Sequence, residues 1–399
     1  MRPASAKTQL GFTLFEMMIS LALGAVVTAA AVSLFSQGVD ATWVTSQRAE
    51  MQQDLRAAEN IMMKDISLAG SGLTSINGED VPLPSTLGSP IYGCSTAGCA
   101  PNGGVKYPCV GAPCSPTLYP IMPGFGLGIK PPGSNTTTDL ITVVYSDVNL
   151  GLNCYQTGAF NAIGNVITFT APTAAQVATC VLPSGLAYPQ ALNNSVNGLV
   201  PGDVVLVQNT QGSAVGEVTA VAGPTGNPNP GTSQYVITFA NGDTLNMNQS
   251  GSANDLTKIC PPIAGGCSTV AGNIQANRLL VITYYLQNIP DPTGATTGTN
   301  ILYRQVNGQP AVPLVDNIAN MQFTYDTYDS SGDLLNATGD GGESLGISPN
   351  QIRKVNIAHL TIHSQLSGTR TSLMATTGYQ SFDVQTSISA RNLSYSNRY

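Results

Sequence analysis

Charged side chains are scarce in this sequence. Only 9% of the 399 residues are Asp, Glu, Lys or Arg, whereas ordinary soluble domains carry about 25%. The 15 Lys and Arg residues are outnumbered by 22 Asp and Glu residues, which gives a formal net charge of −7. Because affinity for nucleic acids comes from cationic side chains that neutralise phosphates, we expect no nucleic acid among the partners.

Histidine is almost absent. The chain has two, His359 and His363, within an alternating strand pattern. Four residues of a strand span about 13 Å, which is too far for both rings to bind one metal ion. The sequence also lacks the GxSxG, HExxH and phosphate-loop motifs of common enzyme classes. We therefore expect a protein that is not an enzyme and that uses no cofactor.

A long apolar run stands near the N-terminus. Residues 1–11 are basic, with Arg2 and Lys7, and residues 12–35 contain one charged residue, Glu16. At about 1.5 Å per residue, a helix over this run is about 36 Å long and can cross a hydrocarbon core of about 30 Å. The basic flank predicts that Met1 lies on the cytoplasmic side.

Glu16 requires a partner, because an intramembrane carboxylate is unfavourable by about 2.5–3.5 kcal/mol on insertion scales. Cleavage between Gly11 and Phe12 would create a cationic α-amine four residues before Glu16. One alternative is an ordinary signal peptide cut near residues 29–31, and another is a signal anchor in which Glu16 snorkels to the surface. The signal-peptide alternative leaves Glu16 without an explanation.

Residues 10–16, Leu-Gly-Phe-Thr-Leu-Phe-Glu, follow a basic leader and precede the apolar run, and they resemble the type IV prepilin signature. In that family a membrane peptidase cuts after the glycine and methylates the new N-terminus, and the apolar helix remains in the mature protein. The resemblance implies cleavage after Gly11 and N-methylation of Phe12. It also implies that Glu16 meets the terminal amine of a neighbouring subunit when the helices stack into a filament.

The helical pattern continues beyond the apolar run. Residues 39–69 contain neither Pro nor Gly, and Gly70 and Gly72 provide a stop. Apolar residues recur every three or four positions, with charged residues on the other faces; the apolar positions are Val44, Met51, Leu55, Ala58, Met62 and Ile66. We predict one helix of about 55 residues, and two helices broken near Gly38 are the alternative.

The rest of the chain shows strand patterns. We predict strands at residues 139–145, 165–170, 203–208, 215–221, 235–240, 279–287, 301–306, 320–326, 352–362 and 382–390. Asn-Gly pairs at 241–242 and 307–308 predict hairpin turns, and antiparallel pairing is favoured because no long helical pattern intervenes. The predicted fold is α+β and pilin-like, with a long N-terminal helix packed on a large antiparallel β head.

Five regions are expected along the chain. They are a prepilin leader (1–11), a membrane and assembly helix (12–70), a Gly/Pro/Cys-rich loop region (71–138), an inserted β module (139–277) and a C-terminal pilin-like sheet (278–399). The apolar strand at 279–287 and the segments beginning at Pro313 and Ile352 are similar to the PilW family of minor pilins. The segment from Pro201 resembles the inserted β module of that family.

The PilW resemblance implies a minor pilin that helps to start pilus assembly and lies at or near the tip, in support of adhesion and twitching motility. Its implied partners are other minor pilins, the major pilin, prepilin peptidase and a tip adhesin. The chain would stand in the inner membrane, with its head in the periplasm, before it joins the pilus at the cell surface. A minor pseudopilin of type II secretion and a secreted β-sheet adhesin with an ordinary signal peptide are the alternatives.

Eight cysteines lie outside the apolar helix, and an exported head would favour disulfides. They are Cys94, Cys99, Cys109, Cys114, Cys154, Cys180, Cys260 and Cys267. Eight thiols allow 105 pairings, and our prediction pairs sequential neighbours: 94–99, 109–114, 154–180 and 260–267. A zinc site in the first four cysteines is the alternative, although an oxidising compartment disfavours thiolate ligands.

Acidic residues gather in a Gly- and Ser-rich loop between two predicted strands. Asp326, Asp329 and Asp333 are the candidates for a calcium site there, with Asp340 and Glu343 nearby. Their spacing does not match a 12-residue EF-hand loop, so an exposed acidic hairpin is the favoured interpretation. We expect no other metal site.

Overall fold

The computed structural model describes most of the chain outside several loops and the termini. The described residues are 13–73, 78–82, 117–131, 136–147, 149–161, 163–178, 180, 188–251, 255–260, 274–290, 298–329, 331–335, 349–363 and 381–395. Two compact units are present: Met1–Gln53 with Ser364–Gln380, and Asp54–His363 with Ser381–Tyr399. Each unit is treated separately below.

One helix, α1 (Leu14–Leu68), runs for 55 residues and belongs to both units. It is continuous through Gly24 and Gly38, which confirms the single helix and excludes the predicted alternative of a break near Gly38. The helix ends where Gly70 and Gly72 adopt the left-handed region, with φ of 79° and 70°. The Gly70 N–H donates to the Val144 carbonyl at 2.8 Å, which ties the helix end to the second unit's largest sheet.

That sheet has seven antiparallel strands: β3 (Ile121–Gly124), β4 (Leu140–Asp147), β7 (Val204–Asn209), β8 (Gly212–Glu217), β11 (Gln275–Ile289), β12 (Thr299–Val306) and β13 (Val312–Val315). Strand β11 is the longest, at 15 residues. One edge of β11 pairs with β4, and the other pairs first with β7 and then with β12. The strand therefore joins two parts of the sheet that are distant in sequence.

Asn307 fills the space between β7 and β12 on that edge. Its side-chain oxygen accepts from the Val281 N–H at 2.8 Å, and its amide donates to the Leu279 carbonyl at 3.0 Å. Asn307 is buried and adopts a left-handed turn conformation, with a φ of 52°. Its side chain makes the hydrogen bonds to β11 that a strand would otherwise make between β7 and β12. The following Gly308 N–H donates to the Gly202 carbonyl at 2.8 Å.

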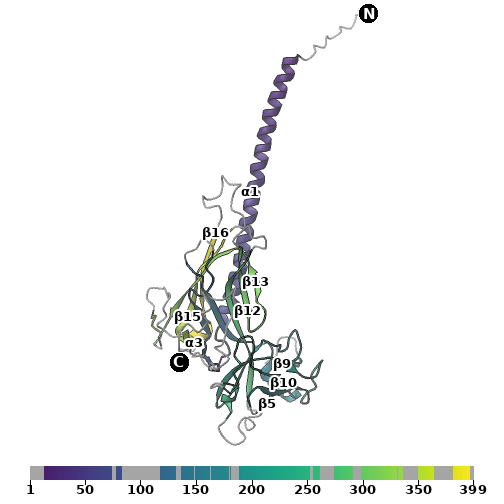
Figure 1. The fold of residues 1–399 in the computed structure, drawn as a ribbon, viewed down its shortest axis with the longest axis vertical. Helices are drawn as coiled ribbons and strands as arrows, with labels where there is room; N and C mark the ends of the chain where they lie inside the picture. The colour runs from purple at the N-terminus through teal and green to yellow at the C-terminus, as the bar shows by residue number, and fades with distance from the viewer. Residues whose placement is uncertain are drawn as a thin grey trace, which may run out of the picture. The chain divides into compact units, whose positions relative to one another are not determined.

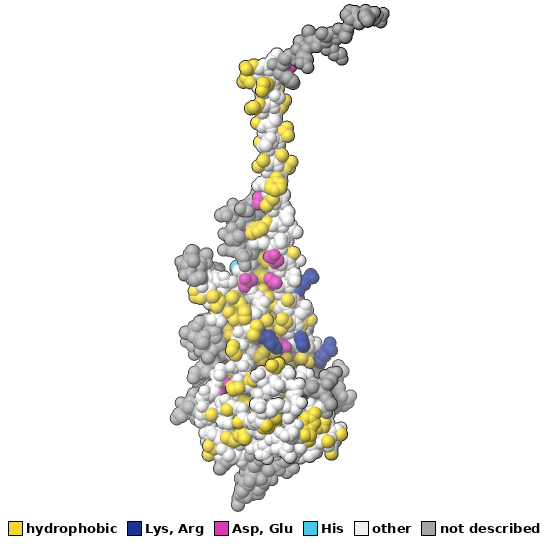
Figure 2. Space-filling model, turned by 90° about the vertical axis from the view of Figure 1, so that its right-hand side faces the viewer, with side chains coloured by type: hydrophobic (Ala, Val, Ile, Leu, Met, Phe, Trp, Pro, Cys, Tyr) yellow, Lys and Arg dark blue, Asp and Glu magenta, His cyan; other side chains and the backbone are white. Residues whose placement is uncertain are grey.

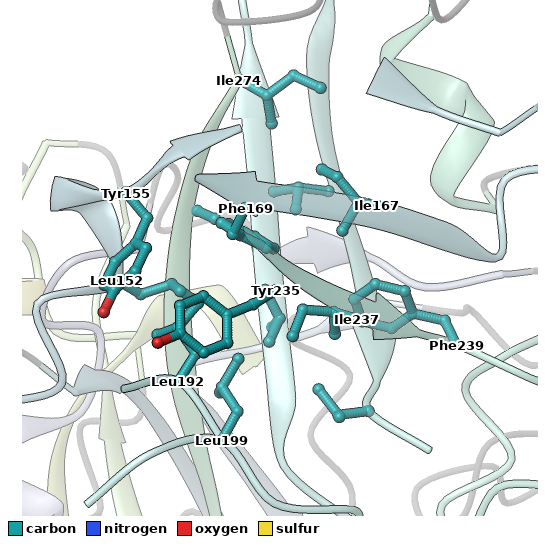
Figure 3. Packing of buried hydrophobic residues seen from close by; sticks show 14 of the residues in the cluster. Leu152, Tyr155, Ile167, Phe169, Leu192, Leu199, Tyr235, Ile237, Phe239 and Ile274 are labelled. Carbon is teal, nitrogen blue, oxygen red and sulfur yellow. The ribbon is translucent and has the colours of Figure 1, made fainter. Parts of the chain in front are cut away.

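A four-stranded sheet packs against the β7 end of the large sheet. Its order is β5 (Gln156–Phe160), β6 (Val166–Thr170), β10 (Gln234–Thr238) and β9 (Ala220–Ala222). Figure 3 shows the aromatic and aliphatic side chains of this core, among them Phe169, Tyr235 and Phe239. Because side chains alternate along a strand, Val205 and Val207 of β7 join this core, while Val204 and Leu206 join the core on the opposite face.

A three-stranded antiparallel sheet contains β14 (Ile318–Thr327), β15 (Ile352–His363) and β16 (Ser381–Ser389), in that order. The short helix α3 (Arg391–Tyr395) contacts β15 (Figure 1). A two-stranded sheet of β1 (Glu79–Asp80) and β2 (Thr117–Leu118) and the short helices α2 (Ala174–Val177), η1 (Leu152–Cys154), η2 (Leu256–Ile259) and η4 (Pro349–Gln351) complete the described elements.

The long apolar helix and the antiparallel sheets confirm the predicted α+β, pilin-like fold class. Every predicted strand overlaps an observed one, and the Asn-Gly turn at 307–308 does lie between paired strands β12 and β13. The hairpin predicted at 241–242 is wrong, because the preceding strand β10 pairs with β6 and β9, whereas β11, the next strand among the described residues, pairs with β4, β7 and β12. There the Asp243 carboxylate accepts hydrogen bonds from the Met247 and Asn248 amides and holds the chain in a loop.

The predicted region boundaries stay predictions. Three short strands, β1 to β3, lie within residues 71–138, which were expected to form a loop region. Strand β4, expected in the inserted module, pairs with β11 of the C-terminal region.

Candidate assembly site on the N-terminal helix

Thr13 and Glu16 form a capping box at the start of α1. One carboxylate oxygen of Glu16, Oε2, accepts from the Thr13 backbone N–H and from the Thr13 hydroxyl, each at 3.0 Å. The Thr13 hydroxyl oxygen in turn accepts from the Glu16 N–H at 3.3 Å. Two N–H groups at the helix start are thereby satisfied.

Only one oxygen of the Glu16 carboxylate takes part in this arrangement. Among the described residues, no hydrogen bond involves its Oε1 atom, and the side chain is exposed. A carboxylate at a helix N-terminus is also stabilised by the helix dipole. Glu16 is therefore held in place by Thr13 while it keeps an acceptor for a cation from another molecule.

The apolar side chains on both sides of Glu16 are exposed in the isolated chain. Leu14, Phe15 and Leu21 have exposed fractions of 80%, 71% and 75%. Figure 2 shows hydrophobic side chains along this part of the helix. By length and composition, α1 can cross a membrane. Burying each large side chain in lipid or against another helix would stabilise the assembly by roughly 1.5–3 kcal/mol.

Two hydroxyl groups of the apolar segment donate to carbonyl groups of the same helix. The Ser20 hydroxyl donates to the Met17 carbonyl at 3.0 Å, and the Thr28 hydroxyl donates to the Gly24 carbonyl at 2.8 Å. A polar group without a partner is unfavourable in hydrocarbon. The apolar segment is thus compatible with a lipid environment and with a dry helical bundle.

The C-terminal part of α1 belongs to the second unit and packs through one apolar face. Leu55, Ala58, Met62 and Ile66 are each at most 1% exposed, which confirms the predicted face over this stretch. Charged residues such as Arg56 and Lys64 are exposed on the other faces.

Asp65 anchors this part of the helix to the large sheet. Its carboxylate accepts from the Tyr145 hydroxyl at 2.9 Å, from the Tyr284 hydroxyl at 2.5 Å and from the Arg304 Nε at 2.8 Å. The side chain of Asp65 is only 4% exposed. Strands β4, β11 and β12 each contribute one donor, so a single carboxylate connects the helix to three neighbouring strands.

The pKa values of the partners follow from this geometry. Burial, followed by the negative charge of Asp65, raises the pKa of both Tyr145 and Tyr284, so both remain protonated donors. Burial alone would lower the pKa of Arg304, but the hydrogen bond and charge of Asp65 outweigh it and raise that pKa. The buried carboxylate therefore has one permanent cation and two neutral donors around it.

The sequence interpretation missed Asp65. A usable signal was present, since Asp65 stands three residues after Met62 and four before Ala69, on the apolar stripe. A charged residue on a buried helix face requires a partner. The identity of those partners depends on the sheet.

Three of the predicted disulfide cysteines are described. Cys154 is buried and Cys180 is partly buried, both as free thiols that interact with each other, while Cys260 is disulfide-bonded. Burial, followed by the neighbouring Cys180 thiol, raises the pKa of Cys154 to about 12. Cys94, Cys99, Cys109, Cys114 and Cys267 lie outside the described residues, and the predicted pairings stay predictions.

The acidic residues of the candidate calcium site have other partners. Asp326 pairs with Lys354 at 3.2 Å and accepts from the Asn356 amide at 2.9 Å. The Asp329 carboxylate accepts from the backbone N–H groups of Ser331 and Asp333 at 2.9 and 2.8 Å. Across the described part of the chain, no three His, Cys, Asp or Glu residues are grouped as a metal ion would require.

A helix with an exposed apolar segment and a carboxylate in its first turn, followed by antiparallel β-sheets, suggests membrane anchoring. Residues 6–32 match the prokaryotic N-terminal methylation motif, which supports a type IV pilin-like or pseudopilin-like protein and suggests a structural subunit. The match includes Gly11 and Phe12, which lie outside the described residues. Comparisons with curated proteins and with solved structures found no match.

Proposed function

We propose that the chain is a minor pilin of a type IV pilus. It is cut after Gly11, methylated at Phe12, held in the inner membrane with its head in the periplasm, and then incorporated into the pilus at the cell surface. The observation that carries this proposal is the methylation motif over residues 6–32, which includes Glu16. The free acceptor oxygen of Glu16 supports it.

In the proposed filament, the Glu16 carboxylate receives the methylated amine of a neighbouring subunit. The exposed apolar side chains of α1 bury one another in the filament core, so the partners through this helix are the major pilin and other minor pilins. An unpaired charge inside that core is unfavourable by several kcal/mol. The Glu16–amine pair would therefore set the axial position of the subunit.

A position at or near the pilus tip is proposed from the size of the head. Removing 11 leader residues from 399 leaves 388, and a head this large would crowd a continuous shaft. A subunit at the tip could help to start assembly, contact a tip adhesin and support adhesion and twitching motility. The resemblance to the PilW family supports the same role.

The test is the mass of the N-terminal peptide from protein recovered from membranes and from sheared filaments. We expect a peptide that begins with N-methylated Phe12, the product of prepilin peptidase. A terminus near residue 32, or an intact Met1, would contradict the proposal and favour a secreted or anchored β domain.

A minor pseudopilin of type II secretion is the second candidate, because the methylation motif supports a pseudopilin-like protein equally well. The two candidates differ in where the mature protein accumulates. Proteomics of sheared surface pili should contain the chain if it is a pilin. Its absence there, together with loss of secretion in a deletion strain, would favour the pseudopilin.

A further inference from the structure

A cavity of about 800 Å³ opens between two loops of the second unit. Residues 188–197 form one wall and residues 225–228 form the other. This volume lies within the range of small-molecule sites, about 300–1,000 Å³. The cavity lies far in sequence from the assembly helix.

The first wall is fixed by the core beneath it. Leu192 and Leu199 are at most 1% exposed, and the Leu199 N–H donates to the Leu192 carbonyl at 2.7 Å. The Tyr155 hydroxyl donates to the Gln190 carbonyl. Figure 3 shows Tyr155, Leu192 and Leu199 among the residues of this core. The loop is thus attached to the core at both ends.

The second wall is attached to the first. The Asn193 side-chain amide donates to the Gly223 carbonyl at 3.0 Å. Pro228 is buried, and beyond it the Gly231 N–H donates to the Ala171 carbonyl at 3.0 Å. Since both walls are held by hydrogen bonds and apolar packing, the cavity is already formed without a ligand.

The lining residues that the structure describes include no Asp, Glu, Lys, Arg or His. Eight of these thirteen residues carry an amide or hydroxyl group, and those of Ser195, Thr225 and Asn227 make no hydrogen bond to any other described residue. An Asn amide both donates and accepts, so it can match two hydroxyl groups of one ligand. Val196, which is 82% exposed, adds an apolar surface at the rim.

Gln190 gives an independent indication of a ligand. Its side-chain oxygen is shielded from solvent and has no hydrogen-bond partner among the residues that the structure describes. A buried acceptor without a donor is unfavourable. Gln190 is one of the residues that line the cavity, so a ligand bound there could bring a hydroxyl donor to this acceptor.

We propose that this cavity binds a neutral oligosaccharide. A ligand rich in hydroxyls satisfies the amides and the Gln190 acceptor, and its C–H faces pack on Val196. Phosphorylated, sulfated or carboxylated ligands are disfavoured because none of the described lining residues is cationic. The inference does not depend on a role in a pilus, since none of these residues belongs to the helix.

The test uses the full chain in a detergent without a sugar headgroup. It is applied to a microarray of neutral oligosaccharides built from hexoses and N-acetylhexosamines, alongside sulfated and sialylated counterparts. The affinity of any hit is then measured by titration calorimetry. We expect binding to at least one neutral glycan and no preference for the anionic forms.

Variants locate the binding site. Asn227→Ala and Thr225→Ala each remove an exposed group that has no hydrogen-bond partner in the described part of the chain, and each should weaken binding about fivefold or more. Asn149→Ala is the matched control, because Asn149 is exposed and lies outside the lining. Its affinity should be unchanged, and all three variants should have wild-type thermal unfolding.

Three results would overturn the proposal. The first is the absence of binding to every neutral glycan, and the second is a preference for anionic glycans. The third is neutral-glycan binding that Asn227→Ala and Thr225→Ala both leave intact. If a peptide library instead yields ligands that these variants abolish, the cavity is a protein-docking site.

Discussion

The two carboxylate oxygens of Glu16 have different roles. One oxygen completes the capping box with Thr13, and the other has no hydrogen-bond partner in the part of the chain that the structure describes. In an isolated helix the capping box satisfies two of the free N–H groups of the first turn. Inside a dry helical bundle, however, a carboxylate also requires a cation, which is the basis of the first prediction.

Replacing Glu16 with Ala should reduce incorporation into filaments at least tenfold, because the terminal amine of a neighbouring subunit would lose its counter-charge. A loss of about 1.4 kcal/mol already corresponds to a factor of ten. The measurement is the amount of the chain in sheared pili from a strain that lacks the native copy.

Glu50→Ala provides the control for this experiment. Glu50 is exposed on the same helix and should be replaceable without an effect. Normal incorporation of the Glu16 variant would contradict the proposed pairing. Equal losses for both variants would also contradict it, because the effect would then belong to the helix and not to Glu16.

Glu217 is a buried carboxyl group that the sequence did not single out. It accepts from the Leu245 N–H at 2.7 Å and from the Thr244 N–H at 3.2 Å. Burial, followed by a hydrogen bond with the neighbouring Asp243 carboxyl, raises the pKa of Glu217 to about 8, although the two backbone donors oppose this shift. The folded protein therefore holds a proton that the unfolded chain releases.

The pH dependence of stability follows from this shift. Between the ordinary value of 4.5 and the raised value of about 8, the folded state binds more protons, so the free energy of unfolding should fall as the pH rises. The expected loss is on the order of 2–4 kcal/mol, complete above about pH 8. In the Glu217→Gln variant the side chain cannot ionise, so the free energy of unfolding, measured with denaturant at pH 5–9, should depend less on pH.

Asp333→Gln is the control for that measurement, because Asp333 is exposed. This variant should leave the pH dependence of the free energy of unfolding as it is in the wild type. A wild-type stability that is constant over this pH range would show that Glu217 is ionised in the folded protein. The inference that the pKa of Glu217 is raised would then be wrong.

The helix and the large sheet are joined by a polar contact within an otherwise apolar interface. Apolar side chains such as Leu55 and Met62 provide most of the buried area, but they do not select one axial position of a helix on a sheet. Asp65 does so, because its donors Tyr145, Tyr284 and Arg304 come from three strands. We infer that this carboxylate sets the register between helix and sheet.

Asp65→Asn should lower the free energy of unfolding by about 3–5 kcal/mol, because it leaves the Arg304 cation without its charge partner. Thermal and denaturant unfolding of the full chain in detergent measure this effect. Asp333→Asn, an exposed change in the same unit, should alter stability by less than about 0.5 kcal/mol.

Rescue distinguishes the ion pair from a general packing defect. The double variant Asp65→Asn with Arg304→Gln removes both charges, so it should recover part of the stability lost by the single variant. Strictly additive losses would contradict a direct coupling between Asp65 and Arg304.

The whole chain combines a long helix, apolar in its N-terminal part, with a β head that is poor in charge and contains the eight cysteines. An exported head would reach an oxidising compartment, where free thiol pairs tend to become disulfides. Cys154 and Cys180 are placed next to each other as thiols. The oxidation state of Cys154 and Cys180 therefore indicates whether the head reaches an oxidising compartment.

We expect a Cys154–Cys180 disulfide in protein recovered from the cell surface. Closing a loop of this size should stabilise the folded state by roughly 3 kcal/mol, so Cys180→Ser should lower stability by about that amount under oxidising conditions only. Peptide mapping without reduction detects the bond. Alkylation of both thiols in the native, unreduced protein would contradict the expectation.

The sequence by itself determined the long helix, because helical periodicity, the absence of Pro and Gly from residues 39–69 and the stop at Gly70 are local properties. It also determined the antiparallel class and the positions of most strands, since period-two patterns and turn residues are local as well. The N-terminal motif, with Glu16, was recognisable for the same reason.

Only the tertiary structure decided which strands pair and which polar groups meet. The two-sided pairing of β11, the use of Asn307 in place of a strand, the partners of Asp65 and the cavity beside Gln190 all join residues far apart in the chain. Asn-Gly at 241–242 shows the limit of local signals, because the Asp243 carboxylate diverts the chain into a loop. Long-range contacts carry no periodicity in sequence, since each depends on the simultaneous position of several strands.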